Sequence, residues 1–294
     1  METLSSAFQD TIKKVVTLSK SSTVVDEHNV YQQGQEETLP YIDHIIDSLI
    51  LPDSGIMGMD HLSALLNKAR EDKACLLLLE HYSNLDLPLF SYLLRRHSER
   101  GKEVAAALVA IAGVKLNESS PTVAAFTGAY TRLVIYPSRS LQGLDSEKDH
   151  DELIRINAIN HAAMKSLIDI KKKGKLVLVF PSGTRYRPWN PSTKRGVREI
   201  DSYIKSFDYM CLVAINGELL HVRRENADSN EDMMDDYVSK GQVHFTAGPV
   251  LSCAEFRNAA RANEKIEDKK QAAVDAVMNQ LELMHQKAQA LMHA

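Results

Sequence analysis

The sequence predicts an α/β protein with a mostly parallel mixed sheet that is flanked by helices and preceded by a small N-terminal helical domain. From Ala74 onward, short apolar runs alternate with helical patterns, as expected when crossover helices join parallel strands. The preceding residues show helical spacing of apolar side chains instead. We therefore expect a helical domain at residues 1–70 and an α/β domain at residues 71–294, in a chain long enough to bury a sizeable core.

The N-terminal region contains three helical patterns. The first places Leu4, Phe8, Ile12, Val15 and Val16 on one face of a single helix. The second runs from Tyr41 to Leu49, and the third from Met59 to Arg70. A further helical pattern, from Asn263 to Ala294, ends the chain, and we expect this helix to dock onto the sheet domain.

Six apolar runs are predicted to be strands, with three helices between them. The strands are Cys75–Glu80, Val104–Ile111, Arg132–Tyr136, Leu176–Phe180, Tyr209–Ile215 and Val243–Thr246. The helices are Leu85–Glu99, Ser120–Ala129 and Asp149–Lys173. The lysines at 171–173 precede Gly174, which is typical of cations at a helix C-terminus before a glycine cap.

The composition excludes several classes of protein. A formal net charge of -4 argues against nucleic acid as a partner, because phosphate binding normally requires a basic excess. The three cysteines, Cys75, Cys211 and Cys253, are far apart and lie beside apolar residues, which favours reduced core thiols in the cytoplasm. The chain begins without a signal-peptide pattern, and no apolar run approaches the ~18 residues needed to span a bilayer. Membrane contact is therefore expected to be peripheral.

The first chemical motif lies where the apolar run Cys75–Leu79 ends. His81 follows this strand, and Asp86 follows five positions later, at the start of the next helix. We expect Asn84 to cap that helix, and the turn to bring the Asp86 carboxylate against one imidazole nitrogen. The other nitrogen of His81 is then available to abstract a proton.

The second motif is Lys175–Pro188, again a strand that ends in a turn of small residues. Arg185, Arg187, Lys194, Arg195 and Arg198 follow with no acidic residue among them. Guanidinium groups suit phosphate, and the backbone of Ser182, Gly183 and Thr184 allows close approach, which predicts an anion site. The alternative is a basic surface loop. Because ligands of open α/β sheets bind beyond the strand ends, the two motifs together favour one joint site.

Other charged segments are interpreted as structural. The acidic stretch 228–236 is expected to be a solvated loop, because it lacks a full cation-ligand pattern. Eight histidines have no ligand spacing and no partner acid at motif distance, and we expect them to be surface or satisfied core groups. They are His28, His44, His61, His97, His150, His161, His221 and His244.

The two motifs in this order resemble those of the glycerolipid acyltransferases. That family carries a histidine, four residues and an aspartate, followed by Phe-Pro-Glu-Gly-Thr-Arg, where this chain has His81 to Asp86 and Phe180 to Arg185. The nearer resemblance is to the soluble, plastid-type glycerol-3-phosphate acyltransferases, whose Pro-Ser-Gly-Gly-Arg-Asp-Arg-Pro is similar to the segment 181–188. The likeness covers most of residues 75 to 220, and such enzymes also have a helical N-terminal domain.

The resemblance implies roles for individual residues. His81 acts as a general base on the substrate hydroxyl, Asp86 orients it, and Arg185 and Arg187 hold the glycerol phosphate. Arg139 falls where the plastid-type enzymes carry a phosphate-pocket lysine, whereas Ser140 replaces the histidine that follows it there. The full substrate-binding set is then Arg139, Ser182, Gly183, Thr184, Arg185, Arg187 and Lys194. No metal or cofactor is required.

The expected activity is transfer of an acyl group from acyl carrier protein or acyl-CoA to the sn-1 hydroxyl of glycerol 3-phosphate, the first step of phospholipid synthesis. Two alternatives stay open: 1-acylglycerol 3-phosphate as the acceptor, and a non-catalytic lipid- or acyl-carrier-binding protein of the same fold. In each case we expect a cytoplasmic protein, with membrane contact limited to the inner face.

Overall fold

The computed structural model describes residues 1–138, 145, 148–223, 233–262 and 267–292. Within these residues, nine strands form one sheet in the order β1-β5-β4-β6-β3-β7-β10-β2, with β11 paired to β7. The strands are β1 (Tyr31–Gln32), β2 (Gly55–Met57), β3 (Cys75–Leu79), β4 (Leu108–Gly113), β5 (Arg132–Ile135), β6 (Leu176–Val179), β7 (Tyr209–Asn216), β10 (His244–Ala247) and β11 (Leu251–Ser252). A separate antiparallel pair joins β8 (Leu220–His221) and β9 (Tyr237–Val238).

The sheet is mixed and largely parallel, which confirms the predicted fold class. The inner strands β5, β4, β6, β3 and β7 are parallel to one another, so their carboxyl ends share one edge. Strand β2 is parallel to β10, whereas β1, β10 and β11 run antiparallel to β5 and β7. Every strand that was predicted from the sequence is present, although the boundaries shift by one to four residues.

The largest shift concerns the run Val104–Ile111, which was predicted to be a strand throughout. Its first half is instead the end of helix α6 (Glu99–Ala107), and β4 begins at Leu108. Ser98 starts that helix, because its side chain accepts a hydrogen bond from the Gly101 N–H. Three consecutive alanines then favour continued helix over strand, so the prediction was wrong for these residues.

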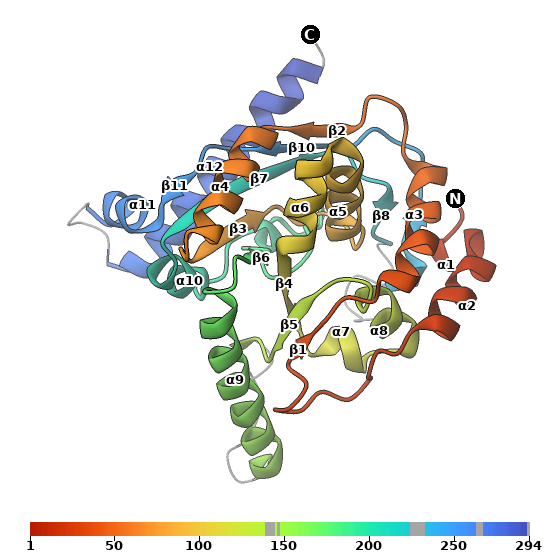
Figure 1. Ribbon diagram of the computed structural model, residues 1–294, viewed down its shortest axis with the longest axis horizontal. Helices are drawn as coiled ribbons and strands as arrows, with labels where there is room; N and C mark the ends of the chain where they lie inside the picture. The colour runs from red at the N-terminus through yellow and green to blue at the C-terminus, as the bar shows by residue number, and fades with distance from the viewer. Residues whose placement is uncertain (139–144, 146–147, 224–232, 263–266, 293–294) are drawn as a thin grey trace.

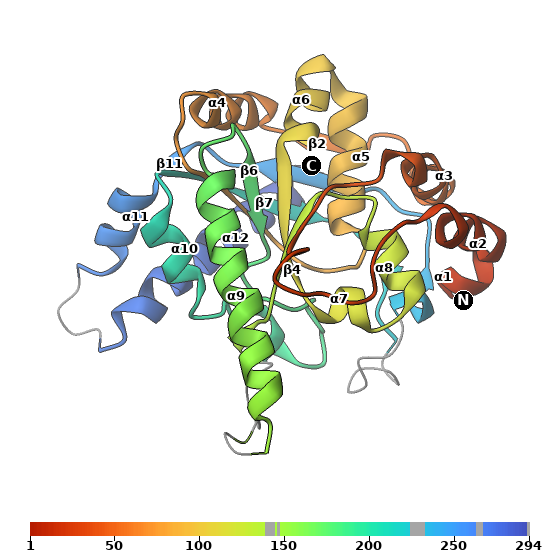
Figure 2. The same cartoon turned by 60° about the horizontal axis from the view of Figure 1, so that its bottom comes forward.

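Helices cover both faces of the sheet (Figures 1 and 2). One face packs against α3 (Leu39–Leu49), α4 (Met59–Arg70), α5 (Asp86–His97) and α6, and it receives Leu77 and Leu79 of β3. The other face packs against α9 (His150–Ile170), α10 (Ile200–Ser206), α11 (Cys253–Ala260) and α12 (Lys269–Met292), and it receives Leu76 and Leu78. This alternation along β3 follows from the two-residue period of a strand.

The N-terminal region joins the same structure. In place of one helix it forms α1 (Leu4–Ala7) and α2 (Gln9–Leu18), separated at Phe8, and it also supplies the strands β1 and β2 at the two ends of the sheet order. Leu4 and Ile45 belong to the same buried cluster as the residues of β3. The remaining short helices are η1 (Glu36–Thr38), α7 (Lys115–Glu118), α8 (Pro121–Thr127), η3 (Pro191–Lys194) and η5 (Met233–Asp235). The proposed domain boundary near residue 70 stays a prediction.

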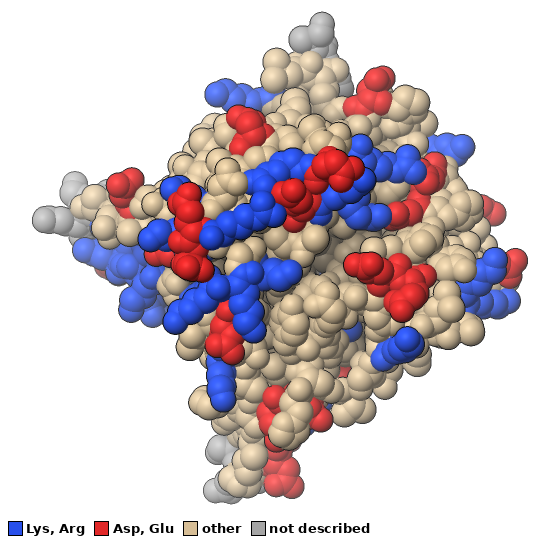
Figure 3. Space-filling view, viewed as in Figure 1, with Lys and Arg blue, Asp and Glu red and all other residues tan. Residues whose placement is uncertain are grey.

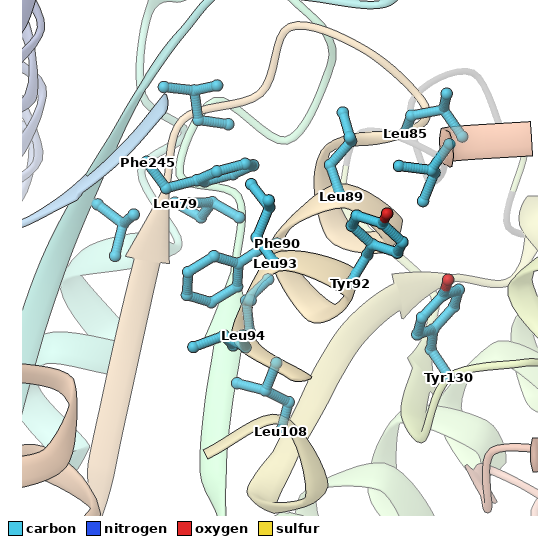
Figure 4. Close-up of a cluster of buried hydrophobic side chains, with 14 of the residues drawn as sticks. Leu79, Leu85, Leu89, Phe90, Tyr92, Leu93, Leu94, Leu108, Tyr130 and Phe245 are labelled. Carbon is cyan, nitrogen blue, oxygen red and sulfur yellow. The ribbon is translucent and has the colours of Figure 1, made fainter. Parts of the chain in front are cut away.

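The core beneath α5 holds the end of β3 in place. Phe90 of α5 and Phe245 of β10 lie with their ring centroids 5.2 Å apart, beside Leu79 (Figure 4). All three side chains are buried. Because the last residue of β3 and the first turns of α5 share this core, the loop between them is anchored at both ends.

Part of the charged surface forms ion pairs. Figure 3 shows a band of Lys and Arg side chains where α4 and α6 lie, interrupted by acidic side chains. Arg70 of α4 and Arg100 of α6 both form ion pairs with Glu103 of α6, at 3.1 and 2.6 Å. The three lysines at 171–173 directly follow α9, and Gly174 has a positive φ of 63°, as the sequence predicted. In the described part of the chain, no helix combines the length and the apolarity that crossing a membrane requires.

Candidate active site

The loop between β3 and α5 brings His81 and Asp86 together. Nδ1 of His81 lies 2.8 Å from Oδ2 of Asp86, so the predicted pair is formed. The Asp86 side chain is buried, whereas that of His81 is 18% exposed. The buried carboxylate thus holds the side of the imidazole that faces the protein, and the ring retains access to solvent.

Asp86 is held as an acceptor by several donors of its own loop. Its Oδ2 accepts hydrogen bonds from the backbone N–H groups of Tyr82 (2.6 Å) and Ser83 (2.9 Å). The Ser83 hydroxyl donates to Oδ1 at 3.0 Å. Asp86 is also the first residue of α5, where the helix dipole favours a negative charge. An ionised carboxylate is acceptor-only, so Nδ1 of His81 carries the proton and Nε2 presents a lone pair.

The predicted cap of α5 differs from the structure. Asn84 does not cap the helix, because the residue at the cap position is Leu85, which makes no side-chain hydrogen bond. The Ser83 hydroxyl accepts from the Leu85 N–H at 3.1 Å instead. The Asn84 side chain is thereby free to reach Asp236, to which it donates at 3.2 Å.

The second motif lies directly against the first. Phe180, the residue after β6, stacks on the His81 ring with centroids 4.0 Å apart and an interplanar angle of 20°. The Tyr186 N–H donates to the His81 carbonyl at 2.8 Å. Strands β3 and β6 are parallel neighbours, and this register brings both loops to one edge. The structure therefore joins the two segments that the sequence predicted to form one site.

Arg185 forms a buried ion pair with Asp236, which also accepts the hydrogen bond from Asn84. The side chains of Arg185 and Asp236 are only 15% and 6% exposed. Burial raises the pKa of Asp236, and its pairing with Arg185 opposes that rise only in part. The expectation that the acidic stretch is solvated is therefore wrong for Asp236. Residues 228–232 of that stretch lie outside the described residues.

The other residues that were predicted to bind substrate have different surroundings. In the turn, Gly183 has a φ of 63°, and the Ser182 hydroxyl donates to the Thr184 carbonyl at 2.7 Å. Arg187 is half-buried, and its backbone N–H donates to Thr193 at 2.9 Å. Lys194 is turned toward α12, where it pairs with Glu282. Arg139 and Ser140 lie outside the described residues.

Sequence reasoning missed a second histidine–carboxylate pair beside the first. Glu80 is buried, and its Oε2 accepts from the Ile215 N–H at 2.8 Å and lies 3.2 Å from Nδ1 of His285 on α12. The Tyr82 hydroxyl donates to Oε1 of Glu80 at 3.1 Å. Burial, followed by the nearby Glu80 charge, raises the pKa of Tyr82, so its hydroxyl stays protonated. The only sequence signal was an acidic residue at the end of an apolar strand.

A third pair lies near the same edge. Nδ1 of His221 is 2.8 Å from Oε1 of Glu218, three residues earlier, and the His221 side chain is 41% exposed, so His221 is a partnered surface histidine. Burial raises the pKa of Glu218, His221 opposes the rise, and the charges of Asp86 and Asp236 add to it. Glu218 follows β7, which is parallel to β3, so it lies at the same edge of the sheet as His81.

No protein-family model matches the chain, and no curated protein matches it. Within the described residues, no group of three or more His, Cys, Asp or Glu side chains has a metal-binding arrangement.

Proposed function

We propose that the protein is a glycerol-3-phosphate acyltransferase that uses His81 as its general base. The observation that carries the proposal is the His81–Asp86 pair, with Nδ1 bound to a buried carboxylate at 2.8 Å and Nε2 making no hydrogen bond with the described residues. This arrangement orients and polarises an imidazole for proton abstraction. The contact between His81 and the loop that carries Arg185 and Arg187 supports an acyl acceptor that has both a hydroxyl group and a phosphate group.

In the proposed reaction, the sn-1 hydroxyl oxygen of glycerol 3-phosphate attacks the carbonyl carbon of an acyl thioester. Nε2 of His81 takes the hydroxyl proton as the new C–O bond forms, and Asp86 stabilises the resulting imidazolium. The tetrahedral intermediate collapses, the C–S bond breaks, and the thiolate of acyl carrier protein or coenzyme A leaves with the proton from His81. An ester and a free thiol result, without a metal or a cofactor.

Phosphate recognition is proposed for the loop that follows β6. Arg185 and Arg187 provide the planar donors that suit a phosphate, and Gly183 allows the backbone to approach it. Arg185 is already paired with Asp236, so an incoming dianion competes with that carboxylate. We place the protein in the cytoplasm, in peripheral contact with the membrane that receives its product.

The test is thioester consumption by the purified protein. Glycerol 3-phosphate and 1-acylglycerol 3-phosphate are compared as acceptors, each with acyl carrier protein and coenzyme A thioesters as donors. We expect the faster reaction with glycerol 3-phosphate, and the His81→Ala variant to lose on the order of 100-fold or more in kcat. His28→Ala, in a side chain that is 85% exposed, is the matched control and should retain the parent rate.

Each alternative predicts a different result in the same assay. A preference for 1-acylglycerol 3-phosphate would assign the second acylation step to this protein. Acyl-chain binding without any turnover would indicate the non-catalytic binding protein. Equal rates for His81→Ala and the parent would remove His81 from the mechanism.

A further inference from the structure

A serine, a histidine and a glutamate form a hydrogen-bonded chain close to the His81 site. Oγ of Ser239 lies 2.7 Å from Nε2 of His221, and Nδ1 of the same ring lies 2.8 Å from Oε1 of Glu218. Glu218 follows β7, His221 ends β8, and Ser239 follows β9. The three groups therefore come from segments that the short β8–β9 pair brings together.

The hydrogen bonds of this chain have one consistent direction. An ionised Glu218 only accepts, so Nδ1 of His221 carries the proton and Nε2 is the acceptor. The hydroxyl of Ser239 must then donate to Nε2. This is the arrangement in which a histidine removes the proton of a serine nucleophile while a carboxylate orients the ring.

The backbone fixes these positions. β8 and β9 are antiparallel, with His221 opposite Tyr237, and the Ser239 N–H donates to the Leu219 carbonyl at 3.0 Å. The turn before Glu218 is made by Gly217, which has a φ of 87°. A Cβ at position 217 would lie 2.0 Å from the Gln242 carbonyl oxygen, so a side chain does not fit this turn.

The hydrogen-bonded network of Ser239, His221 and Glu218 is partly exposed to solvent. The His221 and Glu218 side chains are 41% and 39% exposed, and Ser239 is half-buried. A buried serine–histidine–glutamate network would be explained by the need to satisfy polar groups in a core. Because these side chains are partly exposed, that explanation does not apply to this network.

We propose that Ser239 is an activated nucleophile that accepts an acyl group from an activated ester or thioester. Its Oγ attacks the carbonyl carbon, His221 takes the hydroxyl proton, and the alcohol or thiol leaves with that proton, so that a serine ester remains. The Ser239 N–H is engaged by Leu219 and does not contribute to an oxyanion hole. Without this donor, both the attack of Ser239 on the acyl group and the hydrolysis of the ester are slower than at a site with a complete oxyanion hole.

The experiment uses a fluorophosphonate probe on the full-length protein. Attack by Ser239 forms the O–P bond and releases fluoride, and intact-mass spectrometry should show a single adduct that peptide mapping places on Ser239. Ser239→Ala should abolish the adduct. His221→Ala should slow labelling on the order of 100-fold, and Glu218→Gln should also slow it, because an amide that donates to Nδ1 favours the tautomer with the proton on Nε2.

An internal control is present in the same chain. Oγ of Ser98 lies 3.2 Å from Nδ1 of His97, but no carboxylate of the described residues pairs with the His97 imidazole. The peptide that contains Ser98 should therefore remain unlabelled. Thermal unfolding of each variant confirms that it is folded. Labelling at another serine, or an equal rate in folded His221→Ala, overturns the proposal.

The result is independent of the proposed acyltransfer at His81. His81→Ala should be labelled at Ser239 as fast as the parent protein, because the two histidines have different partners. A protein that loses acyltransfer but keeps the Ser239 adduct separates the two activities, and a protein that transfers acyl groups but shows no adduct contradicts only the Ser239 proposal.

Discussion

Glu80 and His81 are neighbours at the end of β3, and each forms a histidine–carboxylate pair of a different kind. The partner of His81 is five residues away, on the same loop, and the distal imidazole nitrogen is left for chemistry. The partner of Glu80 is His285, 205 residues away on α12, and both oxygens of Glu80 are occupied by protein donors. The first pair is therefore arranged to exchange a proton, whereas the second attaches a helix to the strand end.

The largest expected effect comes from Asp86→Asn. The amide presents a donor to Nδ1 and favours the tautomer in which Nε2 carries the proton, so the base is lost. We expect kcat in the acyltransfer assay to fall on the order of 100-fold or more, with a smaller change in KM. Asp60→Asn is the matched control, because Asp60 also lies in a first helical turn beside a histidine, His61, but is 81% exposed. A parent-like kcat for Asp86→Asn would contradict the assigned tautomer.

Glu80→Ala should act on stability rather than chemistry. It leaves the Ile215 N–H and the Tyr82 hydroxyl without their acceptor in a buried position, at a cost of about 1–3 kcal/mol in the free energy of unfolding. Urea denaturation measures this difference, with Glu37→Ala as the exposed control. If Glu80→Ala lowers kcat more than Asp86→Asn does, the Glu80–His285 pair takes part in the reaction, and the two pairs do not differ in the way stated above.

Phe180→Leu should have a smaller effect than either. It preserves much of the apolar contact but removes the stacking on His81, and aromatic pairs contribute about 0.5–1.5 kcal/mol beyond their buried area. We expect a modest fall in kcat, because the ring becomes less well oriented. Phe256→Leu, in a partly buried aromatic residue of α11, is the control for loss of a ring elsewhere. An unchanged kcat would show that Asp86 alone orients His81.

The smallest effect is on the pH dependence of stability. Burial raises the pKa of Asp236 in the folded protein. The protonated carboxyl therefore contributes to the free energy of unfolding in full below the unfolded-state pKa of about 3.9. This contribution is lost as the pH rises through the folded-state pKa of Asp236. The parent should lose stability relative to Asp236→Asn over that acidic window as the pH increases. Denaturation of both proteins at a series of pH values tests this, and an opposite trend would mean that the Arg185 pair outweighs burial.

The local half of the site was predictable from sequence and the distant half was not. A strand, a turn and a helix start within a dozen residues place His81 and Asp86, and the parallel register of β3 and β6 brings Phe180 and Arg185 alongside. The contacts of Glu80 with His285 and of Arg185 with Asp236 depend on how elements far apart in the chain pack, and periodicity carries no such information. Strands β1 and β2 were missed because runs of two and three residues show no measurable alternation.

The attachment of α12 at Glu80 also has a consequence for synthesis. His81 and Asp86 leave the ribosome almost together, but His285 follows Glu80 by 205 residues. At a synthesis rate of roughly 5–20 residues per second, His285 is synthesised roughly 10–40 s after Glu80. During that interval the Glu80 carboxylate lacks its histidine partner, so a nascent chain carries both members of the first pair well before the second pair can form.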